Sequence, residues 1–211
     1  MKRNEKIRLA IYTILQLSII IAGIIAIWDR EWMNLAFAVF TLFIVNLPSI
    51  YERRFKIDIP DDFEVVLVIF IYAALFLGEL NEFYFRFWWW DKVLHGVSGL
   101  IFGNMGYLIV SYLNQEKKLN VELTPFFVAL FSFCFAVTIG AVWEIYEYAM
   151  DKFFGFFMQR GSLDDTMIDL ILDTLGALVF AVLGYFEEKG KINIVAKFLG
   201  RYEDQEDLFA K

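Results

Sequence analysis

The chain has 211 residues, of which 59% are hydrophobic and 19% aromatic, and a soluble protein of this length could not bury that much apolar surface in one core. Its formal net charge of −7 excludes nucleic acid as a partner, because binding the phosphate backbone needs an excess of basic residues. The composition therefore predicts an all-α, polytopic membrane protein whose apolar surface faces the lipid bilayer.

Six apolar segments follow one another along the chain, each near the ~20 residues that a helix needs to cross the hydrocarbon core. We expect transmembrane helices over Leu9–Trp28, Met33–Ile50, Phe63–Leu80, Val93–Leu113, Pro125–Phe154 and Met167–Phe186. Together they form one transmembrane domain over residues 1–188. The rest of the chain, residues 189–211, is predicted to be a cytoplasmic tail.

The basic residues set the expected orientation of this bundle. All but five of the 19 Lys and Arg fall on one side of the six-span topology. The five on the other side are Arg30, Arg86, Lys92, Lys152 and Arg160. Because cytoplasmic loops carry the excess of Lys and Arg, both termini are predicted to lie in the cytoplasm.

Ionisable side chains occur in pairs at the outer ends of the last three segments. The pairs are Asp91 with His95, Glu144 with Glu147, and Asp169 with Asp173. The members of each pair are three or four residues apart and so share one face of a helix. Ionisable residues within a membrane usually face a polar interior. The sequence therefore predicts an acidic site around the protein's only histidine.

Several carboxylates in a low dielectric cannot all stay ionised unless a cation or shared protons balance them. A divalent metal would do so, and we expect His95, Glu144, Asp169 and Asp173 to hold it. Carboxylates and histidine at such spacings on separate helices resemble the ligands of helical-bundle di-metal sites. Oxygen-rich ligation favours Mg, Mn or Fe, and Zn is also compatible.

The remaining polar residues suggest catalytic roles. Glu147 or Asp91 is the expected general base, and Arg160 is the expected contact for a phosphate or another anion of the substrate. Together these residues predict a metal-dependent hydrolase or transferase acting on an amphiphilic, membrane-associated substrate such as a lipid or lipid phosphate. For Asp91 the local alternative is to complement a helix dipole, and for Asp165 it is to cap the last helix.

Two other functions use the same acids. In the first, the protein is a transporter in which they bind a cation or relay protons. In the second, it is a non-catalytic membrane scaffold in which they only hold helices together.

Small residues share faces with these acids. A stripe of glycines runs along the fourth segment, formed by Gly96, Gly99, Gly103 and Gly106. Gly140 precedes Glu144 by four residues in the fifth segment, and Gly176 follows Asp173 by three in the sixth. Such stripes let transmembrane backbones approach closely, so we expect the acids beside them to point into the bundle.

Three ordered blocks in the second half of the chain resemble a known family. They are Trp90–Gly99 with the pattern aromatic-Asp-x-x-x-His-x-x-x-Gly, Ala141–Tyr148 with Glu-x-x-Glu, and Gln159–Asp165 followed by Asp169 and Gly176. These blocks resemble the YjdF-like (DUF2238) bacterial membrane proteins and, more distantly, the VanZ-like proteins. The resemblance implies a multi-pass protein of the bacterial plasma membrane, and the VanZ-like likeness implies cell-envelope lipids as partners.

Overall fold

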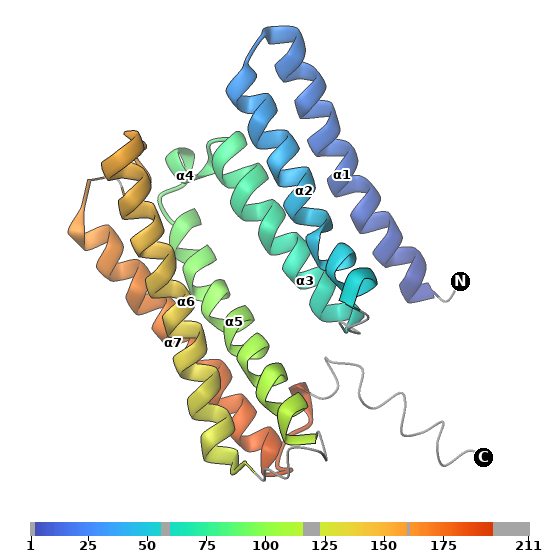
Figure 1. Ribbon diagram of the computed structural model, residues 1–211, viewed down its shortest axis with the longest axis vertical. Coiled ribbons are helices and arrows are strands. Elements are labelled where there is room, and N and C mark those ends of the chain that lie inside the picture. Colours follow the sequence, from blue (N-terminus) through green and yellow to red (C-terminus); the bar gives the residue numbers. More distant parts are fainter. Residues whose placement is uncertain (1–2, 56–59, 116–122, 160, 196–211) are drawn as a thin grey trace. The chain divides into compact units, whose positions relative to one another are not determined.

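The computed structural model describes residues 3–55, 60–115, 123–159 and 161–195, and in these ranges the regular structure is entirely helical (Figure 1). The helices are α1 (Arg3–Asp29), α2 (Trp32–Phe55), α3 (Asp61–Ile71), η1 (Tyr72–Leu80), α4 (Phe83–Arg86), α5 (Trp90–Gln115), α6 (Pro125–Phe154) and α7 (Leu163–Glu188). Six stretches are long and apolar enough to cross a membrane, with α3 and η1 forming one of them. This confirms the all-α, six-span fold, while the cytoplasmic termini and the separate tail stay predictions.

The third span differs from the continuous α-helix that we expected. Its second half, η1, is a π-helix of nine residues, and the four-residue α4 follows it. The Trp90 indole nitrogen donates a hydrogen bond to the carbonyl oxygen of Ala73 in η1 over 3.3 Å. A wider helix leaves carbonyl groups out of the usual register, and a side-chain donor of this kind satisfies one of them.

The described residues divide into two compact units, one up to Trp90 and the other from Asp91. In the first unit, α1, α2, α3 and η1 share a core of buried aliphatic and aromatic side chains. Its buried members are Ile19, Ala38, Val45, Val68 and Phe76. One carboxylate, that of Glu64, is buried in this unit and accepts a hydrogen bond from Ser49 at 2.6 Å.

The second unit contains α5, α6 and α7, and its helix ends follow directly from the sequence. Thr124 caps α6 by accepting a hydrogen bond from the Phe127 amide, with Pro125 in the first turn. The same helix ends at Gly155, whose φ of 75° suits a residue without a side chain. Ser162 caps α7. The end of α6 and the start of α7 are therefore joined by a short loop.

Glycines bring the backbones of α5 and α7 into contact. A Cβ atom on Gly99 would collide with the backbone carbonyl oxygen of Asp173 and lie 2.8 Å from the Ala177 nitrogen. A Cβ atom on Gly176 would in turn collide with the carbonyl oxygen of Gly96. Backbone atoms cannot move aside as a flexible side chain can, so only glycine fits at these two positions.

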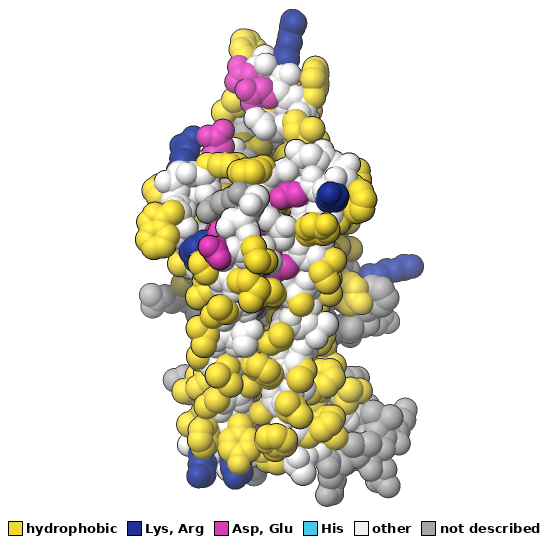
Figure 2. All heavy atoms as spheres, turned by 90° about the vertical axis from the view of Figure 1, so that its left-hand side faces the viewer, with side chains coloured by type: hydrophobic (Ala, Val, Ile, Leu, Met, Phe, Trp, Pro, Cys, Tyr) yellow, Lys and Arg dark blue, Asp and Glu magenta, His cyan; other side chains and the backbone are white. Residues whose placement is uncertain are grey.

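Large apolar side chains of the second unit point outward and its acidic side chains point inward. Ile145 on α6 and Leu175 on α7 are 66% and 51% exposed, whereas Asp169 and Asp173 are each 2% exposed. Figure 2 shows hydrophobic side chains over much of one face of the molecule, with the visible acidic side chains in its upper half. This distribution is the reverse of a soluble core and suits a lipid-facing surface.

We predict that Gly99→Ala and Gly176→Ala each lower the free energy of unfolding by about 1–3 kcal/mol, the usual effect of overpacking a tight contact. Thermal unfolding of the detergent-solubilised protein, followed by circular dichroism, measures the change. Gly96→Ala is the matched control, because a Cβ atom there meets no atom within 4 Å. Equal loss of stability in all three variants would contradict the packing assigned to Gly99 and Gly176.

Candidate metal centre

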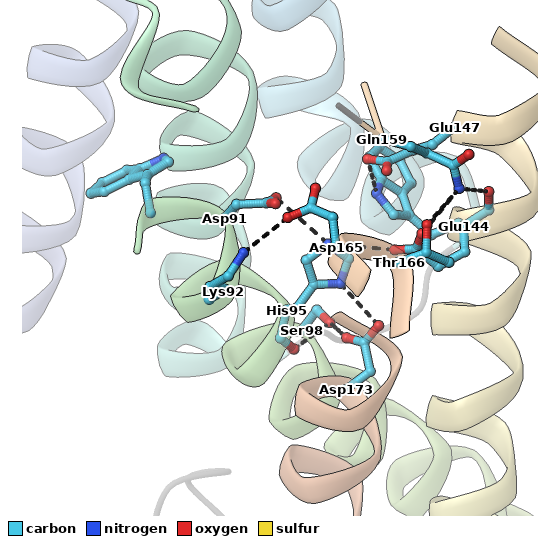
Figure 3. Close-up of polar contacts among 12 residues, drawn as sticks. Asp91, Lys92, His95, Ser98, Glu144, Glu147, Gln159, Asp165, Thr166 and Asp173 are labelled. Atoms are coloured by element: carbon cyan, nitrogen blue, oxygen red, sulfur yellow. Dashed lines mark hydrogen bonds and ion pairs between the residues drawn. The ribbon is translucent and has the colours of Figure 1, made fainter. Parts of the chain in front are cut away.

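The three predicted pairs meet at one end of the second unit, where α5 begins, α6 ends and α7 begins. Figure 3 labels five of their six members, Asp91, His95, Glu144, Glu147 and Asp173. The first turns of α5 supply Asp91 and His95, the last turns of α6 supply Glu144 and Glu147, and α7 supplies Asp169 and Asp173. Sequence periodicity predicted the face of each helix, and the structure confirms that these faces point toward one another.

His95 lies at the centre of the cluster, with different partners at its two ring nitrogens. Its Nδ1 is 3.0 Å from Asp173 Oδ2, a hydrogen-bond distance. Its Nε2 is 3.7 Å from both Asp91 Oδ1 and Glu144 Oε1, which is too long for a hydrogen bond. The side chain is buried, at 6% exposure. The Nε2 edge therefore faces carboxylates without being hydrogen-bonded to them.

Asp173 is enclosed on the other side of the ring. One of its oxygens faces His95, and the second accepts a hydrogen bond from the hydroxyl of Ser98 on α5. The Ser98 hydroxyl also lies 2.8 Å from the carbonyl oxygen of His95. A Cβ atom on Gly140 of α6 would be only 2.5 Å from Asp173 Oδ2, so the glycine makes room for this carboxylate.

Asp91, His95 and Asp169 form the tightest group of possible metal ligands. Each can offer one ligand atom such that all three atoms lie within 4.8 Å of one another. Ligand atoms about 2.0–2.2 Å from one ion are separated by up to roughly 4.4 Å. A small inward movement of these side chains would therefore bring them around a single cation.

Two carboxylate oxygens in the cluster lack hydrogen-bond partners. Among the residues that the structure describes, Asp169 Oδ1 and Glu144 Oε1 are buried without any donor. Leaving a buried acceptor unpaired costs about 1–3 kcal/mol, and more when the group is charged. Buried polar groups are normally satisfied by protein, water or an ion. These two oxygens mark the place where such a partner is needed.

A second set of polar contacts holds the α6 carboxylates. The Gln159 side-chain amide lies 3.4 Å from Glu144 Oε2 and donates to the Thr166 hydroxyl at 3.0 Å. The Trp143 indole donates to Glu147 Oε1 at 2.8 Å. Sequence analysis missed the contributions of Ser98, Gln159 and Trp143, because only the helix arrangement brings them to the acids. All three residues did lie in the blocks that resembled the family.

Lys92 is the cationic side chain beside the cluster, and it is already paired. Its Nζ lies 3.0 Å from Asp165 Oδ1, and both side chains are largely buried. The capping residue of α7 is Ser162, whose hydroxyl accepts a hydrogen bond from the Asp165 amide over 3.3 Å. The carboxylate of Asp165 therefore pairs with Lys92 instead of capping the helix.

The structure brings some of the predicted site residues together and separates others. His95 and Asp169 lie close together, as expected. Asp91, which the sequence suggested as a general base, lies beside these two residues. Glu144 faces the same edge of the imidazole, but Asp173 lies at its opposite edge. Arg160, the expected anion contact, lies outside the described residues.

Comparisons with known proteins agree that the chain is a membrane protein. The family model described as "Predicted membrane protein (DUF2238)" matches residues 7–190. An uncharacterized protein of Thermotoga maritima is 28% identical over 144 residues, which cover 68% of this chain and 72% of the relative. No solved structure matches the chain. The more distant likeness to VanZ-like proteins stays a prediction.

We predict that Lys92→Gln and Asp165→Asn are coupled in a double-mutant cycle. Removing one partner takes the ion pair away from the other, which is largely buried. The double variant should therefore be more stable than the sum of the single changes predicts, by about 0.5–3 kcal/mol. Thermal unfolding in detergent with a chelator present measures this coupling.

The exposed pair of Arg86 and Glu82, 3.4 Å apart, is the control for that cycle. Solvent screens this pair, so its coupling should stay below about 0.5 kcal/mol. Equal coupling in the two cycles would contradict the buried character of the contact between Lys92 and Asp165.

Proposed function

Because this chain belongs to the family of predicted membrane proteins designated DUF2238, we propose a function suited to a multi-pass membrane protein. The protein is a metal-dependent hydrolase or transferase that acts on a membrane-associated lipid or lipid phosphate. Its metal lies between Asp91, His95 and Asp169, with Glu144 as a further ligand. The proposal rests on the cluster at the end of the second unit.

One observation carries the metal assignment. Asp169 Oδ1 is buried, has no hydrogen-bond donor among the described residues, and belongs to the side chain grouped with Asp91 and His95. Within the described part of the cluster, Lys92 forms an ion pair with Asp165, and His95 is hydrogen-bonded to Asp173. A divalent cation would supply the positive charge that the unpaired oxygens of Asp169 and Glu144 need.

The donor set favours certain metals. Imidazole suits Zn and Fe, whereas carboxylates also suit Mn and Mg. A group of one imidazole and several carboxylates therefore favours Mn, Fe or Zn over Mg. When bound, such an ion would act as a Lewis acid on a carbonyl or phosphoryl oxygen of the substrate.

Glu147 is the proposed general base. It lies one turn beyond Glu144 on α6 and is nearly buried, and one of its oxygens accepts the hydrogen bond from Trp143. That hydrogen bond restricts the orientation of the carboxylate. The proposed contact between Arg160 and an anionic group of the substrate rests on the sequence alone.

The surroundings support a membrane-associated substrate. Exposed aromatic side chains continue from the end of α6 into the loop before α7. They are Phe153, Phe154 and Phe157, which are 76%, 71% and 60% exposed. Aromatic residues gather at the level of the lipid headgroups, so the cluster lies close to where a lipid headgroup would be presented.

We predict that the purified protein binds close to one equivalent of Mn²⁺, Fe²⁺ or Zn²⁺, and that Asp169→Asn abolishes this binding. The amide cannot supply the charge that the ion requires, although it has nearly the same shape. Elemental analysis after incubation with each metal and removal of excess metal gives the stoichiometry. Asp164→Asn is the matched control, because Asp164 is an exposed aspartate in the first turn of the same helix.

Two results would contradict the metal centre. One is a correctly folded parent that retains none of these metals, which would favour proton relay or transport by the same acids. The other is equal metal content in the Asp169→Asn variant and the parent.

We predict that Glu147→Gln keeps the metal but lowers turnover by about 10²–10⁴-fold, the usual contribution of a general base. Release of inorganic phosphate from lipid phosphates in vesicles containing the reconstituted protein measures turnover. Loss of metal together with activity would instead make Glu147 a ligand, and unchanged turnover would remove it from the mechanism.

A further inference from the structure

The two ring nitrogens of His95 differ in whether the protein provides a hydrogen-bond partner. Nδ1 is within hydrogen-bond distance of a carboxylate that the Ser98 hydroxyl also contacts. Nε2 faces Asp91 and Glu144 at 3.7 Å, on the side where buried oxygens lack donors. One edge of the ring is therefore fixed by the protein, while the other is left for a ligand.

We propose that Asp173 is a positioning residue that fixes the orientation of His95, so that the ring binds a divalent metal through Nε2. This assignment rests on the proposed function and gives Asp173 a role different from the ligand role expected from sequence. Asp173 holds the proton on Nδ1, which leaves the lone pair of Nε2 directed at the metal. Histidine ligands in metalloproteins commonly donate their other ring N–H to a carboxylate in this way.

The contacts of Asp173 argue against its being a ligand itself. Oδ2 faces His95 and Oδ1 accepts from Ser98, so both oxygens are engaged. The carboxylate is 2% exposed and is bordered by the backbone of Gly140 on α6. By contrast, Asp169, one turn earlier on α7, has a buried oxygen without a donor. Asp173 therefore orients the histidine, and Asp169 binds the ion.

Ser98 sets the position of the Asp173 carboxylate. It lies three residues after His95, so one turn of α5 carries both the ring and the group that holds its partner. The Ser98 hydroxyl lies within hydrogen-bond distance of both Asp173 and the His95 carbonyl oxygen. This links the carboxylate to the backbone of the histidine that it orients.

Because His95 is the only histidine in the protein, one isotope-labelled residue type reports on this site alone. We expect nitrogen NMR of the parent to show a proton on Nδ1 both without metal and with Cd²⁺ bound. The scalar coupling to Cd²⁺ should appear at Nε2. A metal-free ring protonated only at Nε2, or coupling at Nδ1, would overturn the assignment.

Affinity measurements separate this role from that of a ligand. Asp173→Asn should bind Cd²⁺ or Zn²⁺ about 10–100-fold more weakly than the parent, the usual effect of losing an outer-shell partner of a ligand. Asp169→Asn should bind neither. Unchanged affinity in Asp173→Asn would overturn the proposal, and complete loss of binding in that variant while the fold is retained would make Asp173 a ligand.

Gly140→Ala tests the same role while leaving every charge in place. The added Cβ would displace the carboxylate from His95, so we expect weaker binding of Cd²⁺ and a less defined Nδ1 proton signal. Asp164→Asn is the control and should match the parent in both measurements. If the parent binds no metal, the proposed function fails, and the Nδ1 proton in the metal-free protein still decides whether Asp173 orients the ring.

Discussion

Contact between the backbones of α5 and α7 is the constraint on which the site depends. Gly99 and Gly176 let the two helices approach until backbone atoms of one meet the Cα position of the other. At that separation a short aspartate on α7 can reach the imidazole on α5, as Asp173 does with His95. With larger residues at the two glycine positions, the same acids would face a gap that side chains of their length could not cross.

The close approach also explains how charged groups are tolerated in an apolar bundle. Asp173, Glu144 and His95 are almost completely buried. Asp173 and His95 meet each other across two helices, and Glu144 meets Gln159 of the loop that follows its own helix. The same arrangement leaves Asp169 Oδ1 without a donor among the described residues. The unpaired oxygens of Asp169 and Glu144 both belong to the cluster, and the cation that we propose there would supply their missing partner.

Much of the architecture could be predicted from sequence, because hydropathy gives the spans and helical periodicity gives the face of each acid. The predicted bounds of α6 match the observed helix. Periodicity along one helix does not tell which edge of the imidazole a side chain on another helix meets. The different positions of Asp169 and Asp173 around His95 could therefore not be predicted. The π-helical stretch Tyr72–Leu80 was also missed, since its composition is that of an ordinary apolar helix.

The sequence separation within the site has a consequence for biosynthesis. Seventy-eight residues separate His95 from Asp173. At ribosomal speeds of roughly 5–20 residues per second, His95 of α5 is made about 4–16 s before Asp173 of α7. During that interval the helix has neither the glycine contact nor the carboxylate that its histidine will meet. The cluster therefore cannot assemble before α7 has been made, and a nascent chain that stops before Leu163 carries His95 without either α7 aspartate.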